Sequence, residues 1–186
     1  METPTKEALF LDLDKIFEET INWYNQQPED HFNKEMVAGK WTMAGHLYHL
    51  IKTTKGVSKG MSMPRLALRT AFGKSNRVER TFDQQHKKYV DTLDNIAKTT
   101  GKSVVPPEKF VPAAGRTFDK AELTKRFSEE FSSMKNHIAK WKEKDLSVYV
   151  LPHPAMGKLT IREFIYFTIF HTQHHLDNLK NNYVDK

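Results

Sequence analysis

Three histidines near the end of the chain stand in the segment HTQHHLDNL, at positions 171, 174 and 175. His171 and His175 are four residues apart, and in a helix this spacing places both imidazole rings on one face, about one turn apart. Two neutral imidazoles arranged in this way can bind one Zn, Ni, Cu or Fe(II) ion. The pair also continues an inward-facing stripe, so both rings are predicted to point into the protein. The stripe comprises Phe164, Thr168, His171, His175 and Leu179.

The histidine pair is a weak signal by itself, because a buried pair can also be satisfied by hydrogen bonds. His49 supplies a third candidate, about 10 Å into an expected earlier helix. His175 lies about 10 Å from the end of the last helix, so the two depths coincide if these helices run antiparallel. Three converging histidines with an open fourth position are typical of a catalytic metal site. The spacing therefore favours a site formed by His49, His171 and His175.

Helical periodicity predicts four main helices that would position these histidines. In a capping box, the side chains of a cap residue and of a Glu three positions later each accept a hydrogen bond from the other's backbone N–H. Two such pairs favour helix starts at Asp119 (with Glu122) and Thr160 (with Glu163). The expected ranges are Pro4 (capped by Thr3) to about Gln27, Trp41–Thr42 to between Gly56 and Gly60, Asp119 to about Trp141, and Thr160 to about Asn182.

Residues 61–118 form a long connection, and we expect helical content in it because a structureless loop of this length is uncommon. Its expected helical pieces are Leu66–Phe72 and about Phe82–Lys98, followed by a proline-rich stretch at positions 106, 107 and 112. Residues 28–40 are expected to be a loop, and Leu146–Leu151 is the one short β-like run. The sequence predicts an all-α four-helix bundle, as a single domain over residues 1–186.

Composition excludes several kinds of chemistry. The chain has 186 residues and no cysteine, so it has no disulfide, no Cys-ligated zinc or iron–sulfur cluster and no cysteine nucleophile. The first residues lack the basic start and apolar run of a signal peptide. The longest aromatic and aliphatic run, Phe164–Phe170, is far too short to cross a bilayer. A soluble, cytoplasmic protein is the expectation.

The formal net charge is +6, and the excess is concentrated in residues 37–78, which contain no acidic residue. Such a stretch could face an anionic ligand or nucleic acid. A solvated face balanced by acids elsewhere, such as Glu7, Asp12, Asp14, Glu18 and Glu19, is the favoured interpretation. No helix-turn-helix, zinc-finger or RNP-like pattern supports nucleic-acid binding, and salt-dependent binding would be its test.

Two motifs resemble those of the DinB-like (YfiT-like) superfamily. Trp41-Thr42 followed by His49-Leu50 looks like its second-helix motif, and HTQHHLDNL resembles its last-helix HxxxH motif. The segment from His153 to Thr160 is similar to the one that precedes the last helix in many members. The resemblance implies an up-down-down-up four-helix bundle, often dimeric, with one divalent metal ion bound by three histidines. Carried over by position, these are His49, His171 and His175.

The remaining histidines have weaker cases. His46, one turn before His49, could be an alternative ligand or could support a ligand from outside the metal's first shell. His174 is expected to face a partner helix or solvent, and His153 to have a structural role or to lie at the rim. We expect His31, His86 and His137 at the surface, and Trp41 in core packing. A di-iron bundle is not supported, because no Glu-x-x-His occurs, and neither HExxH nor GxGxxG is present.

These residues suggest a metal-dependent enzyme. The resemblance implies transfer of a thiol such as bacillithiol, mycothiol or glutathione to a small electrophile, and the absence of cysteine means that the thiol is a cosubstrate. The alternatives are hydrolysis by an activated water and a non-catalytic metal-binding or stress-response protein. Zn or Ni is the expected metal, with Fe or Mn as alternatives. A small-molecule substrate and a second copy of the chain are the expected partners, whereas membrane and nucleic acid are not.

Overall fold

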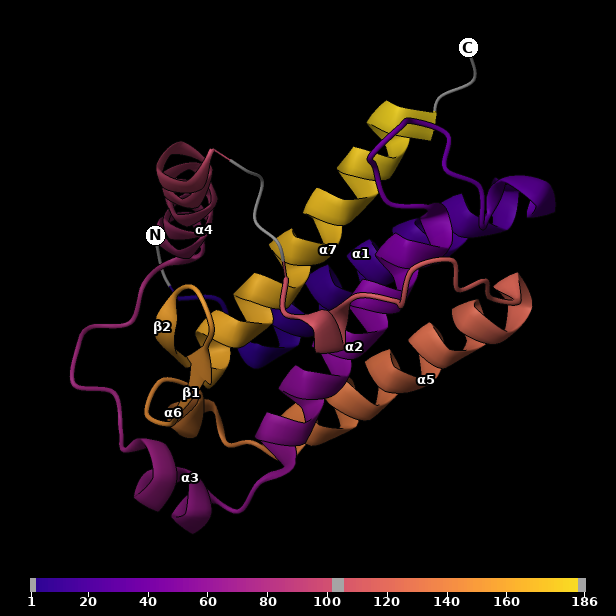
Figure 1. Cartoon of the computed structure of the whole chain (residues 1–186). Helices are drawn as coiled ribbons and strands as arrows, with labels where there is room; N and C mark the ends of the chain where they lie inside the picture. The colour runs from indigo at the N-terminus through magenta and orange to yellow at the C-terminus, as the bar shows by residue number, and fades with distance from the viewer. Residues whose placement is uncertain (1–2, 102–105, 184–186) are drawn as a thin grey trace.

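Four long helices, of 20 to 23 residues each, pack together in the computed structural model, which describes residues 3–101 and 106–183 (Figure 1). They are α1 (Lys6–Gln26), α2 (Met43–Ser62), α5 (Lys120–Ala139) and α7 (Ile161–Tyr183). The prediction of a mostly helical protein is therefore confirmed. The second helix continues two residues past its expected end at Gly60.

Side-chain caps fix the starts of these helices. Thr5, not Thr3, caps α1 by accepting a hydrogen bond from the Ala8 backbone, so this helix begins two residues later than predicted. Asp119 caps α5 by accepting a hydrogen bond from the Glu122 backbone N–H, which is one half of the predicted capping box. Thr160 and Glu163 satisfy each other's backbone N–H groups, at 2.9 and 3.1 Å. Each such cap satisfies donors that the first turn of a helix leaves without partners.

Shorter elements lie between the long helices. They are the 3-10 helices η1 (Glu29–His31) and η2 (Glu108–Phe110) and the helices α3 (Arg65–Phe72), α4 (Phe82–Thr100) and α6 (Glu143–Leu146). The two helical pieces predicted between positions 61 and 118 are therefore present. Part of that connection, positions 102–105, lies outside the described residues.

A short hairpin precedes α7. Its strands β1 (Val150–His153) and β2 (Gly157–Thr160) are antiparallel, with Val150 opposite Thr160 and His153 opposite Gly157. Gly157 has φ +76°, a backbone conformation that glycine adopts at little cost. The predicted β-like run from Leu146 to Leu151 is wrong over its first residues, because Leu146 ends α6 and the strand begins at Val150.

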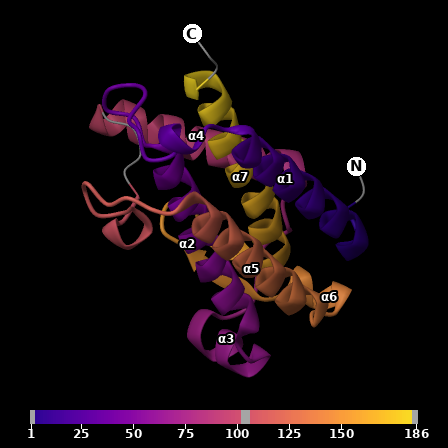
Figure 2. The same ribbon diagram turned by 90° about the vertical axis from the view of Figure 1, so that its right-hand side faces the viewer.

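The order of contacts along each helix gives the relative directions of the helices. From α2 to α5, Lys55 pairs with Glu130, Ser58 contacts His137, and the Met61 carbonyl accepts from Trp141, so these two helices run the same way. Figures 1 and 2 both show α2 and α5 side by side.

Helices α1 and α7 also run in one direction. Arg162 at the start of α7 donates to the Pro4 carbonyl just before α1, and Lys180 near its end pairs with Glu19 at 2.6 Å. Lys135 of α5 pairs with Asp14 of α1, and Lys120 donates to the Gln27 carbonyl, so α1 and α5 run in opposite directions. The helix α4 packs against α7 from outside the four long helices.

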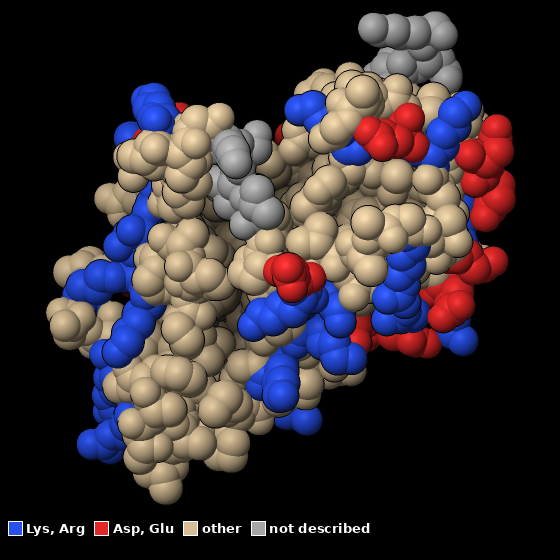
Figure 3. Space-filling model, in the orientation of Figure 1, with Lys and Arg blue, Asp and Glu red and all other residues tan. Residues whose placement is uncertain are grey.

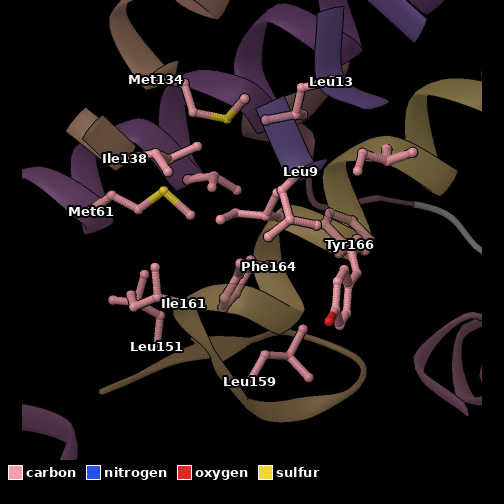
Figure 4. Close-up of a cluster of buried hydrophobic side chains, with 14 of the residues drawn as sticks. Leu9, Leu13, Met61, Met134, Ile138, Leu151, Leu159, Ile161, Phe164 and Tyr166 are labelled. Carbon is pink, nitrogen blue, oxygen red and sulfur yellow. The ribbon is translucent and has the colours of Figure 1, made fainter. Parts of the chain in front are cut away.

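Apolar side chains from all four long helices meet between them. Figure 4 shows part of this core, in which α1, α2, α5, α7 and the hairpin each contribute side chains. The labelled residues are Leu9, Leu13, Met61, Met134, Ile138, Leu151, Leu159, Ile161, Phe164 and Tyr166. Burying one such side chain stabilises the fold by about 1.5–3 kcal/mol. The core therefore contributes hydrophobic stabilisation that does not involve a metal ion.

The basic stretch pairs in part with acids from distant segments. Lys55 pairs with Glu130, Arg65 with Asp145 and Arg77 with Glu163. These acids are not the ones expected from the sequence, but the pairing agrees with a balanced face. In Figure 3, Lys and Arg gather at the left edge and lower centre, and Asp and Glu at the right. Within the described residues, no helix is long and apolar enough to span a membrane.

Candidate metal centre

The three predicted histidines meet inside the protein, between α2 and α7. The Nε2 atom of His171 lies 3.2 Å from Nε2 of His49 and 3.2 Å from Nε2 of His175. All three side chains are buried, with 4–8% of each residue exposed. One potential ligand atom from each residue lies within 4.8 Å of the others. The arrangement brings residues 122 positions apart in sequence into one cluster.

The helices account for this convergence. His171 and His175 lie one turn apart on the buried face of α7, and His49 projects from α2, which is buried around most of its first half. The contacts between α2 and α7 run in opposite order along the two helices, with His46 against His175 and His49 against His171. The two helices are therefore antiparallel. Opposed helices of this kind can place ligands at the same depth from both sides.

Backbone hydrogen bonding selects the nitrogen that His49 turns toward the cluster. Its Nδ1 atom lies 3.0 Å from the carbonyl oxygen of Phe110. Because a carbonyl can only accept, Nδ1 donates its proton there, and neutral His49 keeps the lone pair on Nε2. The lone pair is therefore directed at His171. Metal-ligating histidines commonly donate their second ring nitrogen to a carbonyl in this way.

Burial keeps the cluster uncharged. It lowers the pKa of His49 to about 4, against an ordinary 6.5, although the Phe110 carbonyl acts in the opposite direction. Burial and the neighbouring histidines also lower the pKa of His171 and His175 well below 6.5. Neutral imidazole is the form that binds a metal ion.

Aromatic rings surround the cluster. Trp41 stacks on His175, with centroids 6.1 Å apart and an interplanar angle of 17°, and meets His49 edge-on. Phe167 stacks on His171 at 4.7 Å, and Tyr89 of α4 meets His171 edge-on. The ring of Trp41 thus contacts the site itself. The expectation that Trp41 takes part only in core packing is therefore incomplete. Its position just before α2 is the sequence feature that points to a contact with the histidines.

The donor set fits a small divalent cation. Bonds of about 2.0–2.1 Å in tetrahedral geometry place two ligand nitrogens about 3.3–3.4 Å apart. The two 3.2 Å separations at His171 are close to this value. Among the described residues, His49, His171 and His175 form the histidine and carboxylate group with metal-binding spacing.

A fourth histidine, His46, contacts the cluster through the ring of His175. His46 places Nδ1 2.8 Å from Nδ1 of His175, on the side of that ring opposite Nε2. Burial lowers the pKa of His46 to about 4, and the nearby His49 acts in the same direction. His174 is exposed and interacts with Asn178 at 3.0 Å, as expected for a residue outside the site.

The other histidines lie elsewhere. In the hairpin turn, Nδ1 of His153 accepts hydrogen bonds from the backbone of Ala155 and Met156, which is a structural role. His86 is exposed as expected, whereas His31 and His137 are half-buried, the latter through its contact with Ser58. The expectation of surface positions for these two is met in part, because both side chains remain partly exposed.

Two surface hollows lie away from the cluster. One, of about 630 Å³, runs along α4 and is lined by residues such as Arg80, Lys87 and Asn95. The other, of about 460 Å³, lies between α1 and α5 near Ile21 and Thr124. Neither is lined by a histidine.

Similarity to known proteins is found at the level of the family. No curated protein and no solved structure gives a significant match to the chain. Residues 12–178 match the profile of the DinB superfamily. This range covers most of the chain and contains α2 and the part of α7 that carries His171 and His175. The chain belongs to the DinB superfamily.

Proposed function

We propose that this protein binds one divalent metal ion through Nε2 of His49, His171 and His175 and uses it in a metal-dependent reaction. The single observation that supports the proposal most is the pair of 3.2 Å separations among these buried nitrogens. The order of helix contacts supports the up-down-down-up arrangement that accompanies such a site in the family. Zinc or nickel is the preferred ion for three imidazoles.

The proposed reaction is transfer of a low-molecular-weight thiol to a small electrophile. When bound by three neutral imidazoles, a dication keeps its full charge and favours deprotonation of a coordinated thiol. The chain has no cysteine, so the thiol is a cosubstrate. The residues themselves turn three ring nitrogens toward one point, and their aromatic surroundings limit the entry of water.

A non-catalytic metal-binding role is the second candidate. It is favoured by the burial of the cluster beneath Trp41, Tyr89 and Phe167. Hydrolysis by an activated water requires the same donor set and is the alternative reaction. A homodimer is the expected assembly.

A panel assay tests the proposal. Metal-loaded protein is incubated with glutathione, bacillithiol or mycothiol and with activated aryl and alkyl halides, epoxides and ester substrates. Thiol consumption and conjugate formation are measured by mass spectrometry, with the His171→Ala variant as the control. Turnover that needs both metal and His171 supports the transferase. Ester cleavage without thiol supports the hydrolase, and stoichiometric metal without turnover supports the binder.

A further inference from the structure

The contact between His46 and His175 contains a proton whose position decides whether His175 can bind a metal ion. The two Nδ1 atoms are 2.8 Å apart, which is a hydrogen-bond distance. Both rings are buried and neutral, so one nitrogen donates and the other accepts. Two arrangements are therefore available, and they leave different nitrogens free on His175.

In the first arrangement His175 donates from Nδ1, and its Nε2 has a free lone pair directed at His171. In the second, His46 donates, and His175 carries its proton on Nε2. Only the first can bind a metal ion through Nε2, since the second places a hydrogen where the metal would lie.

The rest of the cluster favours the first arrangement. His49 is fixed with its lone pair on Nε2, because Nδ1 donates to the Phe110 carbonyl. In the second arrangement, Nε2 of His171 would accept a hydrogen bond from Nε2–H of His175. The same atom would then face the lone pair on Nε2 of His49 at 3.2 Å, with no hydrogen between the two nitrogens. In the first arrangement, Nε2–H of metal-free His171 lies between two acceptors, at 3.2 Å from each. This proton leaves Nε2 of His171 when a metal ion binds there.

We infer that His46 is a positioning residue, which accepts the Nδ1 proton of His175 and thereby holds the Nε2 lone pair of His175 toward the metal site. The inference rests on the proposed function. His46 does for His175 what the Phe110 carbonyl does for His49, and the two supports lie on opposite sides of the cluster. Loss of such supporting groups typically weakens metal binding about 10–100-fold.

Two variants of His46 separate this role from packing. His46→Asn places an acceptor oxygen near the position of Nδ1, whereas His46→Leu fills space without an acceptor. The exposed His174, next to His175 in sequence, provides the control His174→Leu. Zinc affinity is measured by competition with a chromophoric chelator, and ring-nitrogen NMR of the metal-free proteins reports the protonated nitrogen of His175. Far-UV circular dichroism verifies folding.

We expect His46→Leu to bind zinc about 10–100-fold more weakly, and His46→Asn and His174→Leu to stay close to wild type. The NMR spectrum of wild type should show the His175 proton on Nδ1. Equal zinc affinity in wild type and His46→Leu, or equal losses in the Leu and Asn variants, would overturn the inference and leave the metal site standing. A wild-type protein that takes up no zinc would overturn the proposed function, and a proton on Nε2 of metal-free His175 would overturn the inference independently. If His46→Leu does not fold, the Asn variant and the NMR measurement decide.

Discussion

The Nδ1 atom of His49 and the carbonyl oxygen of Phe110 lie 3.0 Å apart, although 61 positions separate them in sequence. The connection between α4 and α5 thus contacts the cluster directly and determines which nitrogen of His49 faces it. A ligand held in a single tautomer and orientation loses less freedom on binding a metal ion. The connection between α4 and α5 therefore both links the two helices and orients one of the candidate ligands.

Replacing a ligand should remove the metal and leave the fold. In His171→Ala we expect metal content to fall well below one ion per chain, because two imidazoles cannot replace three. Helicity should be retained, since the apolar core extends over all four long helices. Elemental analysis and circular dichroism measure the two properties, with the exposed His86→Ala as control. Unfolding of His171→Ala would show that this histidine is structural.

Tryptophan fluorescence should report metal binding through Trp41. Its ring stacks on His175, whereas Trp141 contacts Met61 and Arg65 at the other end of α2. Paramagnetic Ni²⁺ or Cu²⁺ at the cluster should therefore quench Trp41 emission. Titration of wild type and Trp41→Phe with Ni²⁺ measures this effect. Equal quenching in both proteins would place the metal elsewhere.

Mild acid should destabilise the metal-free protein, and His153 should account for part of the effect. Burial lowers the pKa of this ring to about 4 from an ordinary 6.5. Between these pH values the unfolded chain binds a proton that the folded chain does not, so the free energy of unfolding falls as pH falls. One such group contributes at most about 1.4 kcal/mol per pH unit.

Chemical denaturation of wild type and His153→Asn from pH 7 to 4 measures this contribution. Asparagine can still accept the backbone hydrogen bonds of the hairpin turn but does not titrate. The variant should lose less stability over this range. Parallel curves for the two proteins would show that His153 titrates normally in the folded state.

The carboxylate of Glu163 should stabilise the fold strongly. It is fully buried, receives hydrogen bonds from Arg77 and Arg80, and caps α7 through the Thr160 backbone. Burial opposes its charge, but the hydrogen bonds from Arg77 and the backbone outweigh burial and lower its pKa. Removing one partner of a buried pair costs about 3–5 kcal/mol.

We therefore expect Glu163→Gln to lose about 3 kcal/mol in the free energy of unfolding. The exposed Glu129, 3.9 Å from Lys125, provides the control. Glu129→Gln should change stability by less than about 0.5 kcal/mol. Urea denaturation measures both. Similar small losses in the two variants would mean that the Arg77 and Arg80 contacts add little.

The histidine cluster was predictable because its spacing is a property of helices. The four-residue separation of His171 and His175 fixes their shared face, and an antiparallel helix brings His49 to the same depth. The sequence left a supporting role of His46 open beside direct ligation, and it did not predict the role of Phe110. The first depends on a proton shared between two rings, and the second on a backbone atom in a connection whose path no periodicity describes.

The hairpin shows a second limit of sequence patterns. Its strands have four residues each, too few for a clear alternation of polar and apolar positions. The prediction therefore followed the apolar residues from Leu146 and missed the strand Gly157–Thr160. That strand is defined by the turn at Gly157 and by its pairing with β1. Both are tertiary features.

The metal content and coordination of the protein purified without an affinity tag and without chelators test the central claim most directly. Elemental analysis together with X-ray absorption spectroscopy should find one divalent ion per chain, bound by three imidazole nitrogens at about 2.0–2.1 Å. The same measurement on His49→Ala should find the ion lost. A protein that takes up no stoichiometric metal after exposure to Zn²⁺ and Ni²⁺, or a bound ion without imidazole ligands, would contradict the account.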